Sequence, residues 1–365
     1  MLTKPYGNTG KQVSAVSFGG MRFSEPVDIE KASELVLYAH SKGINYFDTA
    51  PSYCQSMSEK VMEKALSQVP RDSYFISTKC AARKSSDLRK SLENSLELLK
   101  VDQIDFFHIW WVCSLEEWGL RVSEGAVAEL LKAKEQGLVK HVVISSHLPG
   151  MDIAKVLEQA PFEGVTVGYN ALNFPYRQAA LDYASEKNLG VITMNPLAGG
   201  IIPQHADRFD FLKQSPSDTV VKSALRFIIS QPSVTSALVG FNNKKEIDEA
   251  VSVVENFKPY SQDDIKAIEA NILESFDDLC TGCGYCLPCP ARIEIPKFMD
   301  AYNYEILLGN ADQQIRDRLQ WHWQQNAQTA GTCINCGFCE QRCTQHLSIR
   351  DRLHHIAELA EPGEN

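Results

Sequence analysis

Eight of the eleven cysteines in this 365-residue chain lie in two short runs near its C-terminal end. The runs read CTGCGYCLPC at 280–289 and CINCGFCEQRC at 333–343, so the first three cysteines of each are separated by two residues. Cysteines at this spacing wrap a tight loop whose thiolates can converge on one metal centre. The candidate ligands are Cys280, Cys283, Cys286, Cys289, Cys333, Cys336, Cys339 and Cys343.

Two kinds of metal centre could use these thiolates. Zinc takes four tetrahedral ligands, which usually come as two pairs far apart in the sequence. Two runs of four cysteines fit iron–sulfur cubanes better, and we therefore expect two 4Fe-4S clusters. Clustered thiols in a long chain also argue against the dispersed disulfides of a secreted protein.

The pairing of ligands follows a known pattern. In two-cluster ferredoxins, the fourth cysteine of each run binds the cluster of the other run. By that pattern one cluster takes Cys280, Cys283, Cys286 and Cys343, and the other takes Cys333, Cys336, Cys339 and Cys289. Two departures weaken the pairing more than the clusters themselves: the first run places two residues before its fourth cysteine where three are usual, and Thr344 replaces the usual proline after Cys343.

The first 260 residues alternate short apolar runs with longer amphipathic segments. Eight runs are typical of buried strands; they are 16–18, 46–48, 74–77, 104–107, 142–145, 165–168, 191–194 and 236–239. Helical patterns lie between them at 29–42, 86–100, 125–136, 175–187, 218–231 and 244–257. Strand followed by helix, eight times over roughly 250 residues, predicts a (β/α)8 TIM barrel. A doubly wound sheet is the competing topology, but no GxGxxG motif follows the first strand.

The predicted organisation is therefore α/β with two domains. The barrel spans 1–260, and its opening segment, Leu2–Val13, is typical of a hairpin. Residues 261–365 supply a linker helix and a small, mostly α-helical, ferredoxin-like iron–sulfur domain.

Three polar residues follow the second and third strands, where barrels place their catalytic groups. They are Asp48, Tyr53 and Lys79. A buried lysine beside a tyrosine lowers the phenol's pKa, and a carboxylate keeps the ammonium charged. The phenol could then donate a proton to a carbonyl oxygen while a hydride arrives at carbon. The alternative is purely structural, with Asp48 capping a turn and pairing with Lys79.

Five segments carry a family resemblance: FGGMRF at 18–23, FDTAPSY at 47–53, STK at 77–79, YNALN at 169–173 and MNPLAGG at 194–200. With these segments, residues 1–260 resemble an aldo-keto reductase, and the tail resembles that of a branch with a C-terminal ferredoxin module. The resemblance implies an NAD(P)H-dependent oxidoreductase that transfers hydride to a carbonyl. It places three members of the family's catalytic tetrad on Asp48, Tyr53 and Lys79, with Tyr53 as proton donor.

The fourth tetrad position departs from the family. A histidine is expected near the end of the fourth strand, but Trp110 stands there and His108 lies two residues earlier, about 7 Å deeper on the same face of the strand. A bulge could bring His108 into the site. Trp110 could replace the histidine, or carbonyl reduction could be weakened in favour of another reaction. We favour replacement by Trp110, because a regular strand leaves His108 inside the barrel.

The resemblance further implies NADPH or NADH bound across the barrel mouth. The expected contacts are Ser145, Ser146, Asn170, Met194, Leu197, Gly199, Gly200, Gly240, Asn242, Lys244 and Glu249. The choice between the two cofactors stays open. Lys244 and Lys245 suit a 2′-phosphate, whereas Glu246 suits a free 2′-hydroxyl.

Composition limits the partners. A formal net charge of -10 argues against nucleic acid and against an anionic membrane surface. The N-terminal residues lack the features of a secretory signal, so we expect a cytoplasmic protein. The expected partner is a small carbonyl or other reducible substrate. Whether a redox protein is also a partner stays open.

How the two domains would work together in catalysis also stays open. Hydride transfer moves two electrons, whereas a cubane moves one, and nothing in the sequence indicates a flavin to convert between them. The first hypothesis is a carbonyl reductase with structural clusters. The alternatives are an electron-transfer enzyme whose clusters feed the barrel site, and a nucleotide-binding redox sensor without turnover.

Overall fold

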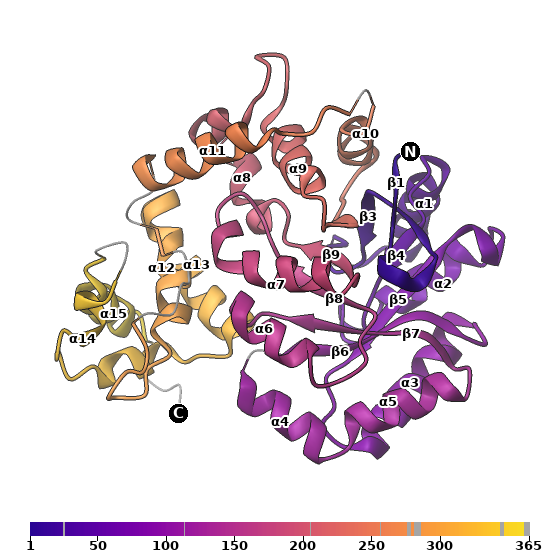
Figure 1. The fold of residues 1–365 in the computed structure, drawn as a ribbon, viewed down its shortest axis with the longest axis horizontal. Helices are drawn as coiled ribbons and strands as arrows, with labels where there is room; N and C mark the ends of the chain where they lie inside the picture. Colours follow the sequence, from indigo (N-terminus) through magenta and orange to yellow (C-terminus); the bar gives the residue numbers. More distant parts are fainter. Residues whose placement is uncertain are drawn as a thin grey trace. The chain divides into compact units, whose positions relative to one another are not determined.

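The computed structural model describes residues 1–24, 26–112, 114–204, 206–255, 257–275, 279–280, 286–343 and 347–360, without the side chains of 273–275. The chain divides into two compact units, Met1–Gln262 and Asp263–Asn365. This division falls two residues after the boundary expected at 260. Figure 1 follows the chain through both units by colour.

Eight parallel strands close into a barrel in the first unit. They are β3 (Val16–Gly19), β4 (Tyr46–Asp48), β5 (Phe75–Cys80), β6 (Ile104–Val112), β7 (Val139–Ser146), β8 (Gly164–Gly168), β9 (Gly190–Met194) and β10 (Ser236–Val239). The barrel closes because Ala237 of β10 lies opposite Val16 on one side and Thr193 on the other. The predicted TIM barrel is therefore confirmed, and each predicted strand run overlaps one of these strands.

Helices surround the strands, and Figure 1 shows α1, α2, α3 and α5 outside them. The helices are α1 (Ile29–Ser41), α2 (Ser58–Leu66), α3 (Ser85–Leu99), α4 (Leu115–Ser123), α5 (Ala126–Glu135), α6 (Gly150–Leu157), α7 (Phe174–Glu186), α8 (Ile201–Gln204), α9 (Val220–Ser230) and α10 (Lys244–Ser252). The sequence did not predict α2, α4 and α6, because helices of eight or nine residues show too little periodicity. No helix in the described part of the chain is long and apolar enough to cross a membrane.

Side-chain caps fix where several helices begin. Asp28 accepts a hydrogen bond from the amide of Lys31 at the start of α1, at 3.2 Å. Asn243 accepts one from the amide of Glu246 at the start of α10, at 3.1 Å. Such caps satisfy amides that lack a partner in the first turn. The cap at Asn243 also positions Glu246.

An N-terminal hairpin, β1 (Thr3–Pro5) and β2 (Gln12–Ser14), precedes the barrel as predicted. Between its strands, Tyr6 enters the barrel core and packs against Phe106, with ring centroids 4.5 Å apart. A Cβ at Gly190 would lie only 2.1 Å from the Tyr6 ring, so this position admits no side chain. The hairpin thus fills the end of the barrel where the strands begin, which leaves their carboxyl ends for chemistry.

The second unit is mostly helical, as expected. After α11 (Gln262–Ser275) come α12 (Ile295–Leu308), α13 (Asp312–Asp317), a π-helix (Arg318–Trp323), a 3₁₀-helix (Ala327–Thr332), α14 (Phe338–Gln341) and α15 (Ile349–Glu358). One apolar core joins these elements around Phe298, Leu353 and Ile356, and Cys286 and Cys339 belong to it. The helices therefore form the scaffold on which both cysteine runs are held.

Candidate active site and cluster-binding cysteines

Asp48 and Lys79 form a buried ion pair at the carboxyl ends of β4 and β5. The Lys79 Nζ atom donates to Asp48 Oδ1 at 2.7 Å and to Oδ2 at 2.6 Å, and each side chain is only 3% exposed. Burial alone would lower the pKa of Lys79, but Asp48 and Tyr53 together, through charge and hydrogen bonding, outweigh burial and raise that pKa. The ammonium therefore stays charged inside the barrel mouth.

Tyr53 lies above this pair, in the turn between β4 and α2. The Lys79 ammonium is 5.0 Å from the centre of the Tyr53 ring. Burial raises the pKa of the phenol, and Lys79 opposes that shift without cancelling it. The expectation of a lowered Tyr53 pKa is therefore wrong in net direction, because desolvation dominates. The phenol keeps its proton at neutral pH, which a proton donor requires.

An unusual turn holds Tyr53 in place. Cys54, Gln55 and Ser56 follow it with φ angles of 50°, 55° and 64°, a left-handed stretch that costs energy for residues with side chains. The Cys54 thiol donates to the carbonyl of Met21, at 3.4 Å, and so ties this turn to the loop after β3. Strained backbone of this kind is concentrated at functional sites.

Trp110 lies beside Tyr53, as expected for the fourth tetrad position. Its ring meets the Tyr53 ring edge-on, with centroids 5.5 Å apart and planes at 86°. The pairing of β6 with β7 is irregular between Ile109 and Val112, and Trp111 has a φ of 66°. Arg121 of α4 donates to the carbonyls of both tryptophans and so fixes this irregular end of β6. Arg121 was not predicted as a site residue, because α4, which carries it, was not predicted either.

His108 lies elsewhere, inside the barrel. It is fully buried, and the β6 irregularity begins after it, so no bulge brings it beside Tyr53. Its Nε2 atom is 2.9 Å from Thr166 Oγ1, and its Nδ1 atom is 3.3 Å from Ser77 Oγ. Burial, helped by the charge of Lys79, holds the pKa of His108 well below its usual range. His108 is therefore a neutral histidine beneath the ion pair.

A groove of about 700 Å³ runs beside the barrel mouth, between the ends of β9 and β10 and the start of α10. Six expected cofactor contacts line it: Leu197, Gly199, Gly200, Gly240, Asn242 and Glu249. Lys244 does not; it borders a neighbouring hollow, with its Nζ atom 5.1 Å from the Tyr38 ring centre. The groove also includes Arg22 and Gln204, which were not among the expected contacts. Arg22 falls within the FGGMRF segment, which was the available signal for it.

The other expected cofactor residues lie at the ends of β7, β8 and β9. Ser145 and Asn170 are almost fully buried, and Met194 is half-buried. The Asn170 amide donates to the Asn195 carbonyl at 3.1 Å, while its oxygen accepts from the amide of Leu172. Ser146 donates to the carbonyl of Val112. Asn170 and Ser146 thus shape the local backbone whether or not they also contact a ligand.

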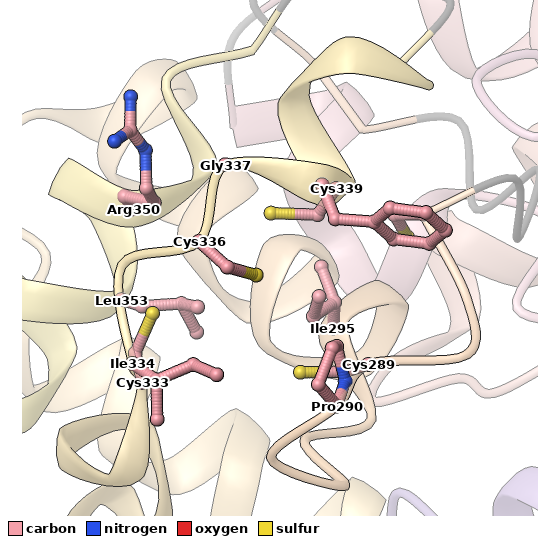
Figure 2. Close-up of a pocket in the computed structure, with 12 residues that line it drawn as sticks. Cys289, Pro290, Ile295, Cys333, Ile334, Cys336, Gly337, Cys339, Arg350 and Leu353 are labelled. Atoms are coloured by element: carbon pink, nitrogen blue, oxygen red, sulfur yellow. The ribbon is translucent and has the colours of Figure 1, made fainter.

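Five cysteines line one hollow in the second unit: Cys286, Cys289, Cys333, Cys336 and Cys339. Figure 2 shows the sulfur atoms of Cys289, Cys333, Cys336 and Cys339 turned toward a common space. Gly337, with a φ of 72°, lets the chain turn between the last two of these. Thus Cys286 and Cys289 of the first run meet the first three cysteines of the second run. The swapped pairing predicts Cys289 at this place but assigns Cys286 to the other cluster.

The remaining expected ligands are Cys280, Cys283 and Cys343. Cys283 lies outside the described residues, and Cys280 and Cys343 do not line the hollow. Asn303 of α12 anchors Cys280 by accepting from its amide at 2.7 Å and donating to its carbonyl at 3.0 Å. Within the part of the chain that the structure describes, no three metal-ligating side chains converge on a single-ion site. A soft, thiolate-only donor set around the hollow suits an iron–sulfur cluster.

The barrel and its site define the class of protein, a (β/α)8 oxidoreductase with an iron–sulfur appendage. Residues 15–272 match the aldo/keto reductase family, and residues 279–348 match the 4Fe-4S dicluster domain. The chain therefore belongs to the aldo/keto reductase family, in a branch with a C-terminal 4Fe-4S dicluster domain.

Individual relatives agree with this assignment. L-galactose dehydrogenase of Arabidopsis thaliana is 30% identical over 307 residues, which cover 75% of this chain and 94% of the relative. The NADH-specific methylglyoxal reductase of Escherichia coli is 24% identical over 224 residues, covering 54% and 68%. Among solved structures, an aldo-keto reductase from Bacillus halodurans in its holo form has a TM-score of 0.65 at 20% identity, covering 74% of this chain and 96% of that one. This last likeness concerns the fold alone.

Proposed function

We propose that this protein reduces a carbonyl group of a small molecule by hydride transfer from a bound nicotinamide dinucleotide, with Tyr53 as proton donor. The observation that carries the proposal is the stack of Asp48, Lys79 and a protonated Tyr53 at the barrel mouth, beside a groove large enough for a nucleotide. When bound, the nicotinamide supplies the hydride.

Each residue of the stack has one task. As Tyr53 gives its proton to the carbonyl oxygen, negative charge develops on the phenol. The Lys79 ammonium, 5.0 Å from the ring centre, stabilises that charge, and its effect is large because the Lys79 side chain is only 3% exposed. Asp48 holds Lys79 in place through two hydrogen bonds. Trp110, edge-on to Tyr53, forms a wall of the substrate site and takes the place of the family's histidine.

The substrate proposal stays at the level of chemical class. A relative named L-galactose dehydrogenase makes aldoses and their oxidised forms reasonable first candidates, and one named methylglyoxal reductase adds small dicarbonyls. Turnover of NADH or NADPH against such a panel tests the proposal. Absence of turnover, with nucleotide still tightly bound, would favour the redox-sensor alternative.

We further propose that the second unit holds two 4Fe-4S clusters, one of them on Cys289, Cys333, Cys336 and Cys339. The convergence of these four sulfur atoms in Figure 2 supports this set. The other cluster would take Cys280, Cys283, Cys286 and Cys343. Reduced thiols of this number are typical of a cytoplasmic location, which we include in the proposal.

The groove favours NADH over NADPH. Glu246 lines it, and its carboxylate accepts from the amide of Asn242 and from the side chain of Asn243, both at 2.8 Å. Glu249 adds a second carboxylate to the same lining, whereas Lys244 borders the neighbouring hollow. A 2′-phosphate near the start of α10 would therefore meet like charge, and a 2′-hydroxyl would meet an acceptor.

Replacing Glu246 by lysine is expected to shift the ratio of kcat/KM for NADPH over NADH upward by at least about tenfold, because repulsion of the 2′-phosphate becomes attraction. Steady-state kinetics with both nucleotides measure the shift. Glu255→Lys, the same charge change at an exposed position outside the groove lining, serves as the control. Equal ratios in the two variants would show that Glu246 does not face the 2′ position.

A further inference from the structure

A chain of buried hydrogen bonds runs beneath the ion pair, from β8 to β4. It links Thr166 to His108, His108 to Ser77, and Ser77 to Asp48. All four residues, taken whole, are at most 2% exposed. The strands bring them together: Asp48 lies opposite Ser77 in the sheet register, and Lys79 lies opposite His108.

The direction of each bond can be derived. A carboxylate only accepts, so Ser77 must give its one proton to Asp48 Oδ1, at 2.8 Å. His108 Nδ1 is 3.3 Å from the Thr78 carbonyl, which also only accepts, so Nδ1 carries a proton and can share it with Ser77 Oγ. The other ring nitrogen, Nε2, must then accept from Thr166 Oγ1. Every link points the same way, toward the carboxylate.

The chemistry of His108 agrees with this direction. A neutral imidazole has one N–H and one lone pair, as the relay requires, whereas an imidazolium would have two N–H groups and no acceptor for Thr166. Burial and the nearby Lys79 keep the ring neutral by lowering its pKa. A histidine that only filled space would not need to reach a hydroxyl that is bonded to the carboxylate.

We propose that Thr166, His108 and Ser77 form a relay that fixes the orientation of the Asp48 carboxylate, and through it the position of the Lys79 ammonium under Tyr53. These three are positioning residues, since the relay lies below the ion pair. The inference rests on the proposed function, in which Lys79 stabilises charge on the Tyr53 phenol. Without the bond from Ser77, Asp48 Oδ1 would be held by Lys79 alone, and the ion pair could rotate.

Two substitutions of His108 separate the relay from simple packing. The amide nitrogen of asparagine can take the place of Nδ1 and keep the bond to Ser77, whereas that of glutamine takes the place of Nε2 and loses it. His108→Gln is expected to lower kcat about tenfold or more, a usual effect of removing a residue that orients a catalytic group. His108→Asn is expected to stay within about threefold of the wild type. KM should not change in either variant, because neither alters a substrate contact.

The relative kcat values of His108→Gln and His108→Asn decide between a relay and simple packing. Equal losses of kcat, a larger loss in His108→Asn, or a change in KM instead of kcat would overturn the relay. Ser77→Ala gives a second test, because it removes the last link while leaving His108 in the core. If the relay exists, Ser77→Ala combined with His108→Gln should be no slower than Ser77→Ala alone, whereas independent roles would give multiplied losses.

A spectroscopic measurement tests the relay separately from the proposed function. In ¹⁵N spectra of the histidine rings, assigned by the signal lost in His108→Asn, His108 should show the neutral tautomer with the proton on Nδ1. It should not titrate while the protein stays folded. A protonated Nε2 in an enzyme that turns over carbonyls would overturn the relay alone. Absence of turnover together with the Nδ1–H tautomer would overturn the proposed function alone.

Discussion

Tyr53→Phe should lower kcat for carbonyl reduction by about 10²–10⁴-fold, the range that a positioned general acid contributes. The substitution removes the only atom that gives a proton in the proposed step and leaves the ring in its contact with Trp110. The Lys79–Asp48 pair does not involve the phenol oxygen, so the pair should persist. The dissociation constant of the nucleotide should therefore change little. Steady-state kinetics and nucleotide titration give both quantities.

The chain offers a matched control for this substitution. Tyr183 on α7 also has a lysine over its ring, with Lys187 Nζ 5.5 Å from the ring centre, but it lies on an outer helix. Tyr183→Phe should leave kcat unchanged. If Tyr53→Phe retained most of the activity, another group would supply the proton, and the assignment of Tyr53 would be wrong.

Cys289→Ala should remove one cluster and spare the other, so that iron falls from about eight to about four atoms per chain, as expected for two cubanes. The reason is the swapped pairing, in which this cysteine of the first run serves the cluster of the second run. Cys289 lines the same hollow as Cys333, Cys336 and Cys339. Iron and sulfide analysis of anaerobically purified protein, with electron paramagnetic resonance of the reduced form, measures the loss.

Cys336→Ala tests the same cluster assignment from the second run of cysteines. Because Cys336 is assigned to the same cluster, the two variants should lose the same resonance signal and keep the same remaining one. Cys80→Ser, a buried thiol of the barrel strand β5, should keep all the iron. Different surviving signals in Cys289→Ala and Cys336→Ala would contradict the swapped pairing and favour clusters that each use a single run.

Much of the fold follows from the sequence pattern. The strands of the barrel were visible because buried parallel strands are short apolar runs, and the cysteine runs marked the second unit. Helices α2, α4 and α6 were missed because they are too short to show a clear period. The irregular end of β6 was considered for His108, but the structure places it beyond that residue, at Trp110 and Trp111.

The candidate site was predicted residue by residue, but not its electrostatics. Spacing placed Asp48, Tyr53 and Lys79 together, since carboxyl ends of neighbouring parallel strands meet at one mouth. The net direction of the Tyr53 pKa depends on how much desolvation outweighs Lys79, which only the packed structure determines. The relay through Ser77 and His108 was also out of reach, because it joins strands far apart in the sequence through side-chain orientation.

The most direct test of the central claim follows the hydrogen atom itself. Nicotinamide dinucleotide deuterated at the transferred position is supplied to anaerobically purified enzyme with a carbonyl substrate, and the alcohol is examined by mass spectrometry. Hydride transfer in the barrel predicts one deuterium on the former carbonyl carbon. An alcohol that carries only solvent hydrogen there would contradict direct hydride transfer and would favour the alternative in which the clusters feed the barrel site.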